Sequence, residues 1–421
     1  MYLSVRDRPA SAGRTDGSAA ARPVGRVVIT LGLVSLLTDV SSESVAAILP
    51  LYLTAVVGLS PAAFGFIDGL YQGASVLVRL GGGWIADRTD RPKWVAFSGY
   101  ALSCVARVFL LFAAGAGSIA AVVATDRVGK GIRTAPRDAM ISSATPTEHL
   151  GRAFGVHRTL DTIGAALGPF IAFAVLWMIP DGYLTVMVIS LGFAFVGVAL
   201  LGLLGPDQRV RPERAGPTPP PFRWKDLTDR RLTRLLVIAG TLGVLTVGDG
   251  FLYLTLLDRG GFGAVWFPLL YVGTNIAYLA LAVPIGLLAD RFGRARVLVA
   301  GHLALAGAYC CATVPASGVV ATVATLALLG TFYAATDGVI AAIAGRLVPV
   351  QARTSGIAAA QTVVAVARMV AAAGFGLLWV LIGPSTAMLG VALALLVVIG
   401  LTFTPAVRLD RAGTEDVGVP A

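Results

Sequence analysis

The chain repeats one short polar pattern, first as Gly83-Trp-Ile-Ala-Asp87-Arg88-Thr-Asp90-Arg91-Pro-Lys93 and again as Gly286-Leu-Leu-Ala-Asp290-Arg291-Phe-Gly293-Arg294-Ala-Arg296. Glycine, acid and arginine fall at the same offsets in both copies. Each copy follows the second long apolar segment in its half of the chain. A repeat at this distance indicates that the two halves are related structural units.

The segments around these turns are strongly apolar. Of the 421 residues, 56% are hydrophobic and only 13% are charged, whereas a soluble domain carries about 25% charged residues. A helix needs about 20 mostly apolar residues to cross a bilayer core about 30 Å thick. Twelve runs meet this length, at residues 27–56, 61–86, 94–114, 118–142, 155–178, 183–204, 235–257, 264–289, 297–314, 318–344, 355–382 and 385–406. We therefore predict an all-α integral membrane protein with twelve transmembrane helices, arranged as two six-helix bundles related by an internal repeat.

The basic residues between the runs predict the topology. The turns after the second, fourth, eighth and tenth runs carry Arg or Lys, whereas the other short turns carry none, except for Arg259 after the seventh. By the positive-inside rule both termini are cytoplasmic. The predicted parts are an N-terminal tail, a first bundle, a Pro- and Arg-rich cytoplasmic linker, a second bundle and a C-terminal tail, at residues 1–26, 27–204, 205–234, 235–406 and 407–421. We expect a multi-pass protein of a bacterial plasma membrane.

The composition also argues against several classes of protein. The net charge is +10, but the basic residues lie in the tail, the linker, short loops and the spans, so we expect no nucleic-acid partner. Cys104, Cys310 and Cys311 lie in apolar stretches and make no disulfide framework or metal spacing. No nucleophile with its base and no phosphate-binding loop is recognisable in the sequence, so we expect neither an enzyme nor a bound cofactor.

The pattern G-x-x-x-D-R-x-G-R after the second span of each half resembles the signature loop of the major facilitator superfamily. The second copy matches this pattern fully, whereas the first has Asp90 in place of the glycine, which supplies a positive φ freely. The resemblance extends over nearly the whole chain and implies that these loops act as a conformational latch at the cytoplasmic face. The latch residues it implies are Gly83, Asp87, Arg88, Arg91, Gly286, Asp290, Arg291, Gly293 and Arg294.

Two further stretches are similar to motifs of the same superfamily. Arg127-x-x-Lys130-Gly131 resembles the R-x-x-Q-G motif of the fourth helix, with Lys in place of Gln. Gly164-x-x-x-Gly168-Pro169 in the fifth span resembles the motif of the antiporter branches, which are largely exporters such as drug/proton antiporters. The two glycines and Pro169 imply close packing and a bend in that helix.

The fourth span carries an ionic stripe. At 100° per residue its charged residues fall within an arc of about 140°; they are Asp126, Arg127, Lys130, Arg133, Arg137 and Asp138. Three central cations facing lipid would cost about 8 to 10 kcal/mol, so they must face partners or a water-filled cavity. One hypothesis is a neutral network, because acids such as Asp161 balance the bases inside the first half.

Carboxyl groups inside the spans are the candidates for proton coupling. Asp39 and Lys130 lie at similar depth near the midplane, at about 1.5 Å rise per residue. We hypothesise that Asp39 or Glu43 exchanges a proton while paired with Arg127 or Lys130. We expect Asp249, between two glycines in the seventh span, either to act in substrate binding or proton coupling or to form a pair with Arg368. The full set of candidate substrate and proton-coupling residues is Asp39, Glu43, Arg107, Arg127, Lys130, Arg133 and Asp249.

These features predict a secondary active transporter, a proton-coupled exporter of a small molecule working by alternating access. A first alternative is an anion exchanger or importer, in which the cationic face of the fourth span binds an organophosphate or a carboxylate. A second alternative is a non-transporting receptor or scaffold built on a transporter fold. The expected partners are a small-molecule substrate, protons and membrane lipid, and we expect a monomer.

Overall fold

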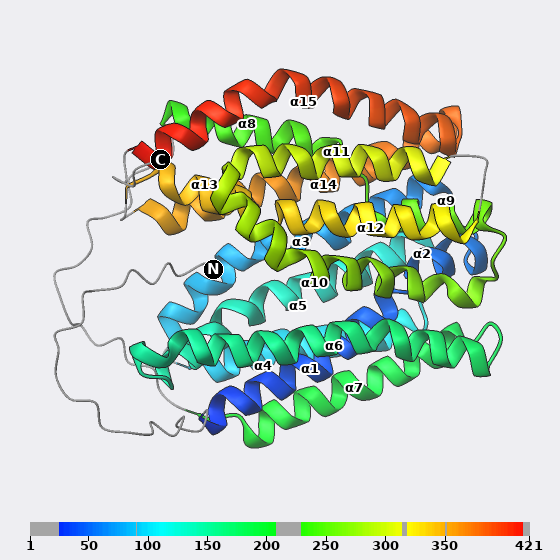
Figure 1. Cartoon of the computed structure of the whole chain (residues 1–421). Helices are drawn as coiled ribbons and strands as arrows, with labels where there is room; N and C mark the ends of the chain where they lie inside the picture. Colours follow the sequence, from blue (N-terminus) through cyan, green and yellow to red (C-terminus); the bar gives the residue numbers. More distant parts are fainter. Residues whose placement is uncertain (1–24, 90, 208–228, 314–317, 350–351, 416–421) are drawn as a thin grey trace, which may run out of the picture.

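The computed structural model describes residues 25–89, 91–207, 229–313, 318–349 and 352–415. Within these ranges all regular secondary structure is helical. The long helices run side by side between two ends of the molecule (Figure 1). At one end, here named the linker end, α1 and α8 begin and α7 and α15 end (Figure 1). The opposite end is named the far end.

The first half of the chain forms six long helices with three short helical turns. Its elements are α1 (Arg26–Ala46), α2 (Leu49–Leu51), η1 (Tyr52–Val56), α3 (Pro61–Thr89), α4 (Pro92–Leu110), α5 (Ala116–Ser143), η2 (Thr147–His149), α6 (Leu150–Met178) and α7 (Tyr183–Leu204). Proline occupies the first position of α3 and α4, where its missing N–H would have no intrahelical partner in any case.

The second half repeats this order with more interruptions. Its elements are α8 (Arg230–Val244), α9 (Asp249–Gly260), η4 (Ala264–Trp266), α10 (Phe267–Phe292), α11 (Arg294–Thr313), α12 (Val319–Thr336), α13 (Val339–Leu347), α14 (Arg353–Ile382) and α15 (Pro384–Glu415). Asp229 caps α8, since its carboxylate accepts hydrogen bonds from the backbone N–H groups of Arg231 and Leu232, at 2.6 and 3.4 Å. Gly261 and Gly383 have φ of +65° and +81° where α9 and α14 end.

Among the described residues, nine helical segments are long and apolar enough to cross a membrane. They are Arg26–Val56, Leu150–Met178, Tyr183–Leu204, Arg230–Gly260, Ala264–Phe292, Arg294–Thr313, Val319–Leu347, Ser355–Ile382 and Pro384–Arg411. Helices α3, α4 and α5 lie among them (Figure 1) but are not counted, because they do not meet the requirements for both length and apolar composition. Helix α5 is not apolar enough because it carries the charged residues of the ionic stripe. The predicted total of twelve spans, and the predicted domain boundaries, therefore stay predictions.

Three of the predicted spans are interrupted, which the apolar runs did not indicate. In the seventh, α8 ends at Val244 and α9 begins only at Asp249. In the tenth, Gly338 has φ of +76° between α12 and α13. In the first, α1 ends at Ala46 and a short π-helical turn, η1, follows α2. Interrupted helices expose backbone polar groups, which a membrane protein tolerates only where protein or water satisfies them.

The two halves meet most extensively through α3 with α14 and α6 with α10, and also where α2 contacts α9 and η4 contacts α6. Small residues on α3 allow the closest approach. A Cβ added at Gly69 would lie 2.7 Å from the carbonyl oxygen of Met369, and one at Gly65 would collide with that of Ala372. Gly376 likewise lies against Pro61, the first residue of α3. These contacts involve the first third of α3 and the second half of α14, so the halves are in contact toward the far end.

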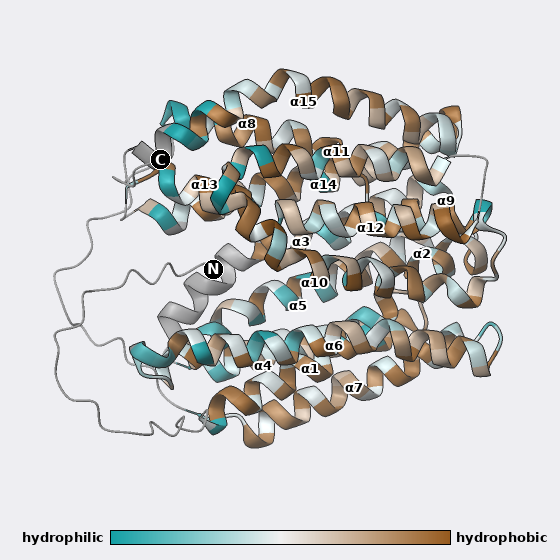
Figure 2. Ribbon diagram, in the orientation of Figure 1, coloured by the Kyte–Doolittle hydropathy of each residue, from teal (hydrophilic) through white to brown (hydrophobic). Residues whose placement is uncertain are grey.

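The outer surface of the helices is apolar. Leu203 on α7 is 83% exposed and Val320 on α12 is also 83% exposed. Figure 2 shows that the hydrophilic segments gather at helix ends and loops, and along α5 in the interior. An exposed apolar surface of this extent fits a lipid environment, since it would be unstable in water.

Candidate functional site

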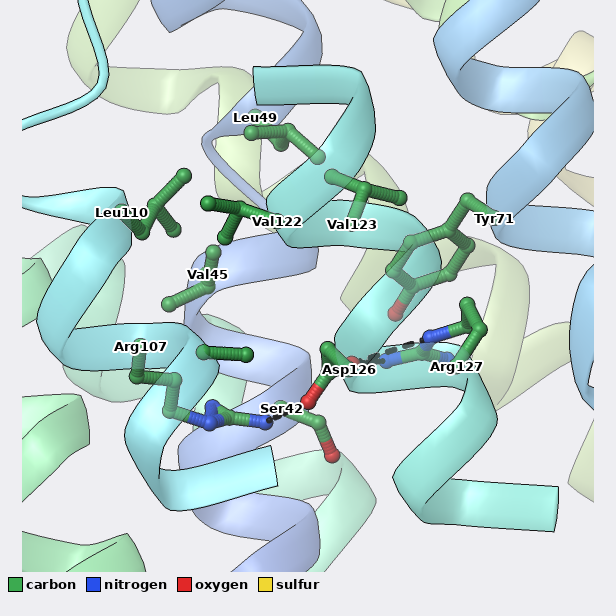
Figure 3. Close-up of a pocket in the computed structure, with 11 residues that line it drawn as sticks. Ser42, Val45, Leu49, Tyr71, Arg107, Leu110, Val122, Val123, Asp126 and Arg127 are labelled. Atoms are coloured by element: carbon green, nitrogen blue, oxygen red, sulfur yellow. Dashed lines mark hydrogen bonds and ion pairs between the residues drawn. The ribbon is translucent and has the colours of Figure 1, made fainter. Parts of the chain in front are cut away.

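The centre of the first half holds two arginines on one carboxylate. Arg107 Nη2 of α4 lies 3.3 Å from Asp126 Oδ1 of α5. Arg127 donates to the other oxygen of Asp126, through Nε at 3.0 Å and through Nη2. Figure 3 shows Arg107 and Arg127 approaching Asp126 from opposite sides. One carboxylate between two buried guanidinium groups forms charge-assisted hydrogen bonds to both, and it leaves the cluster with one excess positive charge.

Other groups complete this cluster. The Arg127 guanidinium carbon lies 3.9 Å from the centre of the Tyr71 ring, a cation–π contact from α3. Arg107 also donates to the hydroxyls of Ser41 on α1 and Ser190 on α7, at 2.7 and 3.2 Å. The cluster therefore ties together five helices of the first half.

A small cavity of about 30 Å³ adjoins the cluster. Its polar end is formed by Ser42, Tyr71 and Arg107 with the ion pair, and its other walls are apolar side chains such as Val45 and Leu110 (Figure 3). A space of this size holds about one water molecule. It is too small for an organic substrate in this conformation.

Two more cations of the ionic stripe also have partners. Arg133 donates to Ser103 at 3.2 Å and its guanidinium carbon lies 4.6 Å from the centre of the Tyr100 ring. Arg137 pairs with Asp138 at 3.0 Å and donates to Ser35 at 2.9 Å. The stripe thus turns toward α1, α3 and α4 inside the first half.

Lys130 differs from its neighbours on α5. Among the described residues it forms no direct ion pair, and its attractive electrostatic interactions are with Asp39 and Glu43 of α1. Asp39 is in hydrogen-bond contact with a second carboxyl group, that of Asp161 on α6. Arg137 lies 4.0 Å and Arg158 3.5 Å from Asp161. The carboxyl pair therefore lies between a free amine and two arginines.

The structure places Lys130, but not Arg127, beside the acids of α1. Arg127 does not pair with Asp39 or Glu43, because Asp126 beside it in α5 reaches its guanidinium first. Lys130 does lie near both acids. Asp161 was expected only to balance charge, and its contact with Asp39 was missed. The sequence signal was weak, because Asp161 and Asp39 are far apart in the chain and only the packing of α6 on α1 brings them together.

The second half contains a sparser polar group. Asp249, at the start of α9, accepts a hydrogen bond from the Tyr333 hydroxyl of α12 at 2.7 Å. Arg368 of α14 interacts electrostatically with Asp249 and lies 5.8 Å from the Tyr333 ring centre. Asp249 lies near Arg368 but forms no direct ion pair with it among the described residues. This arrangement is compatible with both roles considered for Asp249, a functional one and a partner of Arg368. Asp68 of α3 also faces Asp249 across the halves.

The residues assigned to packing lie between α1 and α6. A Cβ on Gly168 would lie 2.7 Å from the backbone nitrogen of Ser44, and one on Gly164 would collide with the carbonyl oxygen of Leu36. Helix α6 is continuous through Pro169. These glycines allow the contact that places Asp161 near Asp39.

The latch residues of the second copy form a turn. Gly293 has φ of +95° between α10 and α11, which suits glycine alone. Asp290 pairs with Arg294 at 3.6 Å within this turn, and its side chain is 70% exposed. Arg291 is exposed beside it, as is Gly286 on α10. In the first copy Arg91 precedes α4, whereas Gly83, Asp87 and Arg88 fall outside the side chains that the structure describes.

No cluster of three or more histidine, cysteine, aspartate or glutamate side chains that could hold a metal occurs in the described part of the chain.

Comparisons with known proteins agree with this architecture. The sequence profile of the Major Facilitator Superfamily matches residues 31–274 and 267–418. An uncharacterized MFS-type transporter of Methanocaldococcus jannaschii is 30% identical over 292 residues, which cover 67% of this chain and 71% of the relative. An uncharacterized protein of Mycobacterium tuberculosis is 31% identical over 291 residues, covering 66% of this chain and 69% of the relative.

Two solved structures with a similar fold are transporters. A variant of the nucleoside transporter NupG has a TM-score of 0.77 at 15% identity, covering 90% of this chain and 100% of that chain. A bacterial homolog of the human lysosomal transporter Spinster, in an inward-facing and unoccupied conformation, has a TM-score of 0.73 at 14% identity. The match covers 94% of this chain and 99% of that chain. The chain belongs to the major facilitator superfamily and is a multi-pass membrane transporter.

Proposed function

We propose that this transporter is a proton-coupled exporter of a small molecule, and that Asp39 and Asp161 carry the coupled proton. The observation that supports this most directly is the hydrogen-bond contact between the two carboxyl groups. Two carboxylates repel each other, so a hydrogen bond between them requires one to be protonated. In this proposal the pair shares one proton in the present conformation.

Lys130 gives this proton a means of release. Its amine interacts with Asp39 from the neighbouring α5 and has no direct ion pair of its own among the described residues. If α1 and α5 shift so that Lys130 reaches Asp39, the ammonium group takes the place of the proton. Proton release is then linked to a change in helix packing, which is the requirement for coupling.

The contacts favour this function over an anion exchanger. In the alternative, the cationic face of the fourth span would bind the anion. Two cations of that face are engaged with the protein itself, since Arg127 shares Asp126 with the neighbouring Arg107 and Arg133 stacks on Tyr100. A receptor or scaffold would not need an unpaired lysine beside a protonated acid pair. Export rather than import follows from the resemblance of the stretch from Gly164 to Pro169 to the antiporter motif.

The two signature loops act as a latch at the linker end in this proposal. In the present conformation the halves contact each other toward the far end. Asp290 pairs directly with Arg294 and interacts at longer range with Arg346 of α13. We expect Asp290 to exchange this local partner for one on a neighbouring helix when the linker end closes.

The test is transport by the purified protein in proteoliposomes with an imposed pH gradient and a panel of candidate compounds. Asp39→Asn and Asp161→Asn should each abolish accumulation driven by the gradient while leaving downhill exchange partly intact. Asp181→Asn, an exposed acid in the loop between α6 and α7, is the control and should behave as wild type. If both variants, together with Glu43→Gln, still concentrate the compound against its gradient, the coupling acid lies elsewhere.

A further inference from the structure

A second pair of carboxyl groups lies where the two halves of the protein meet. Asp68 belongs to α3 in the first half, and Asp249 begins α9 in the second half. The two carboxyl groups are close enough to interact electrostatically. Because α3 and α9 belong to different halves, this pair forms only when the halves are together.

Asp68 is packed against the interruption between α8 and α9. A Cβ added at Gly248, the residue before α9, would collide with Asp68 Oδ2, so the carboxyl oxygen lies directly against the glycine backbone. This oxygen is buried and has no hydrogen-bond partner among the described residues. The amide of Gln72, one turn along α3, donates to the carboxyl group. An ionised carboxylate in this position would be poorly solvated.

Among the described residues, no cation of the neighbouring helices acts on Asp68. Asp249 on α9 is the charged group that acts on it. The Tyr271 phenol on α10 interacts with Asp68, Asp249 and Glu43. Arg368 on α14 acts on Asp249 rather than on Asp68. On α5, Arg127 and Lys130 interact with Asp126 and with the acids of α1.

We propose that Asp68 binds a proton when the halves close at the far end, and that this proton neutralises the Asp68–Asp249 pair. With the halves apart, both carboxylates face water and are ionised. On closing, the proton enters from the far-end solution and remains on Asp68 until the halves separate. The close contact with Gly248 leaves no room for a hydrated metal ion or an organic cation at Oδ2.

This inference depends on alternating access, as the proposed function does, but it does not depend on Asp39 and Asp161. Its test therefore measures closure rather than transport. Spin labels are attached to cysteines introduced at Pro180 and Val319, exposed positions at the far ends of the two halves. The three native cysteines are replaced, and pulsed EPR distances in lipid nanodiscs report the ratio of closed to open molecules at each pH.

In the wild-type background the ratio should fall as pH rises from about 5 to about 9, with a limiting slope of about tenfold per pH unit for one proton. Asp68→Asn should stay closed over this whole range, because the amide carries no charge. Asp249→Asn should also shift toward the closed state, which keeps the test decisive if the first variant does not fold. Asp258→Asn, an exposed acid on the same helix as Asp249, is the matched control and should retain the wild-type slope.

Three outcomes would overturn the proposal. One is a closed-to-open ratio that does not change with pH in the wild-type background. Another is an unchanged slope in Asp68→Asn. The third is closure driven by sodium ions at alkaline pH, which would show that the carboxyl pair binds a metal cation instead. A further result is that Asp68→Asn loses the pH dependence of the closed-to-open ratio and still transports against a gradient driven by protons. That combination would show that Asp68 acts independently of the coupling site on α1 and α6.

Discussion

At the scale of single residues, Asp126 has the largest predicted effect on stability. It holds Arg107 and Arg127, whose side chains are only 6% and 5% exposed. Removing one partner of a buried pair leaves an uncompensated charge and costs roughly 3 to 5 kcal/mol. Asp126→Asn leaves two such charges and should strongly lower the thermal stability of the protein in detergent.

The matched control for this prediction is Asp138→Asn on the same helix. Asp138 is 33% exposed and pairs with Arg137, which keeps Ser35 and Asp161 as further partners. Its loss should therefore lower the melting temperature much less, because water and the remaining partners solvate the arginine. Equal losses in the two variants, measured by thermal unfolding, would show that the double ion pair is not a centre of stability.

At the scale of elements, the contact between α1 and α6 depends on glycine. Gly168→Ala places a methyl group 2.7 Å from the backbone nitrogen of Ser44, where neither side is flexible. Overpacking of this kind costs about 1 to 3 kcal/mol. Gly155→Ala, on the same helix, meets no atom within 4 Å and should be neutral or stabilising by up to about 1 kcal/mol.

This pair of variants also tests the coupling geometry. Because the glycines set the distance between the helices, Gly168→Ala should weaken proton-driven transport by moving Asp161 away from Asp39, whereas Gly155→Ala should not. Transport in proteoliposomes at matched protein amounts is the measurement. Wild-type transport by a folded Gly168→Ala protein would mean that the carboxyl contact tolerates a wider helix separation.

At the scale of the whole molecule, the topology predicts which solution each loop meets. The linker near Pro219 is outside the described residues, and the charge pattern predicts that it is cytoplasmic. A cysteine introduced at Pro219 should not react with an impermeant thiol reagent in intact cells, whereas one at Pro180, at the far end, should react. Both are made in a background without the three native cysteines. Reaction at Pro219 alone would reverse the orientation.

The class of the protein follows from its sequence by itself. Apolar runs of membrane-spanning length are local properties, so composition was enough to predict an all-helical membrane protein, and the transporter family agrees with the signature loops. The positive φ of Gly293 was likewise expected from its motif. The interruption before Asp249 was not expected, because the run from 235 to 257 is apolar throughout apart from that one acid.

Only the tertiary structure decided which charges meet. The sequence showed acids and bases in similar numbers within the first half, but it could not choose among their pairings. Arg127 forms an ion pair with Asp126 because the two are neighbours in α5. Asp39 contacts Asp161 because glycines of α6 allow this helix to pack closely against α1. Asp68 meets Gly248 through the closure of two halves. Such contacts depend on helix rotation and separation, and these are set by packing between segments far apart in the chain.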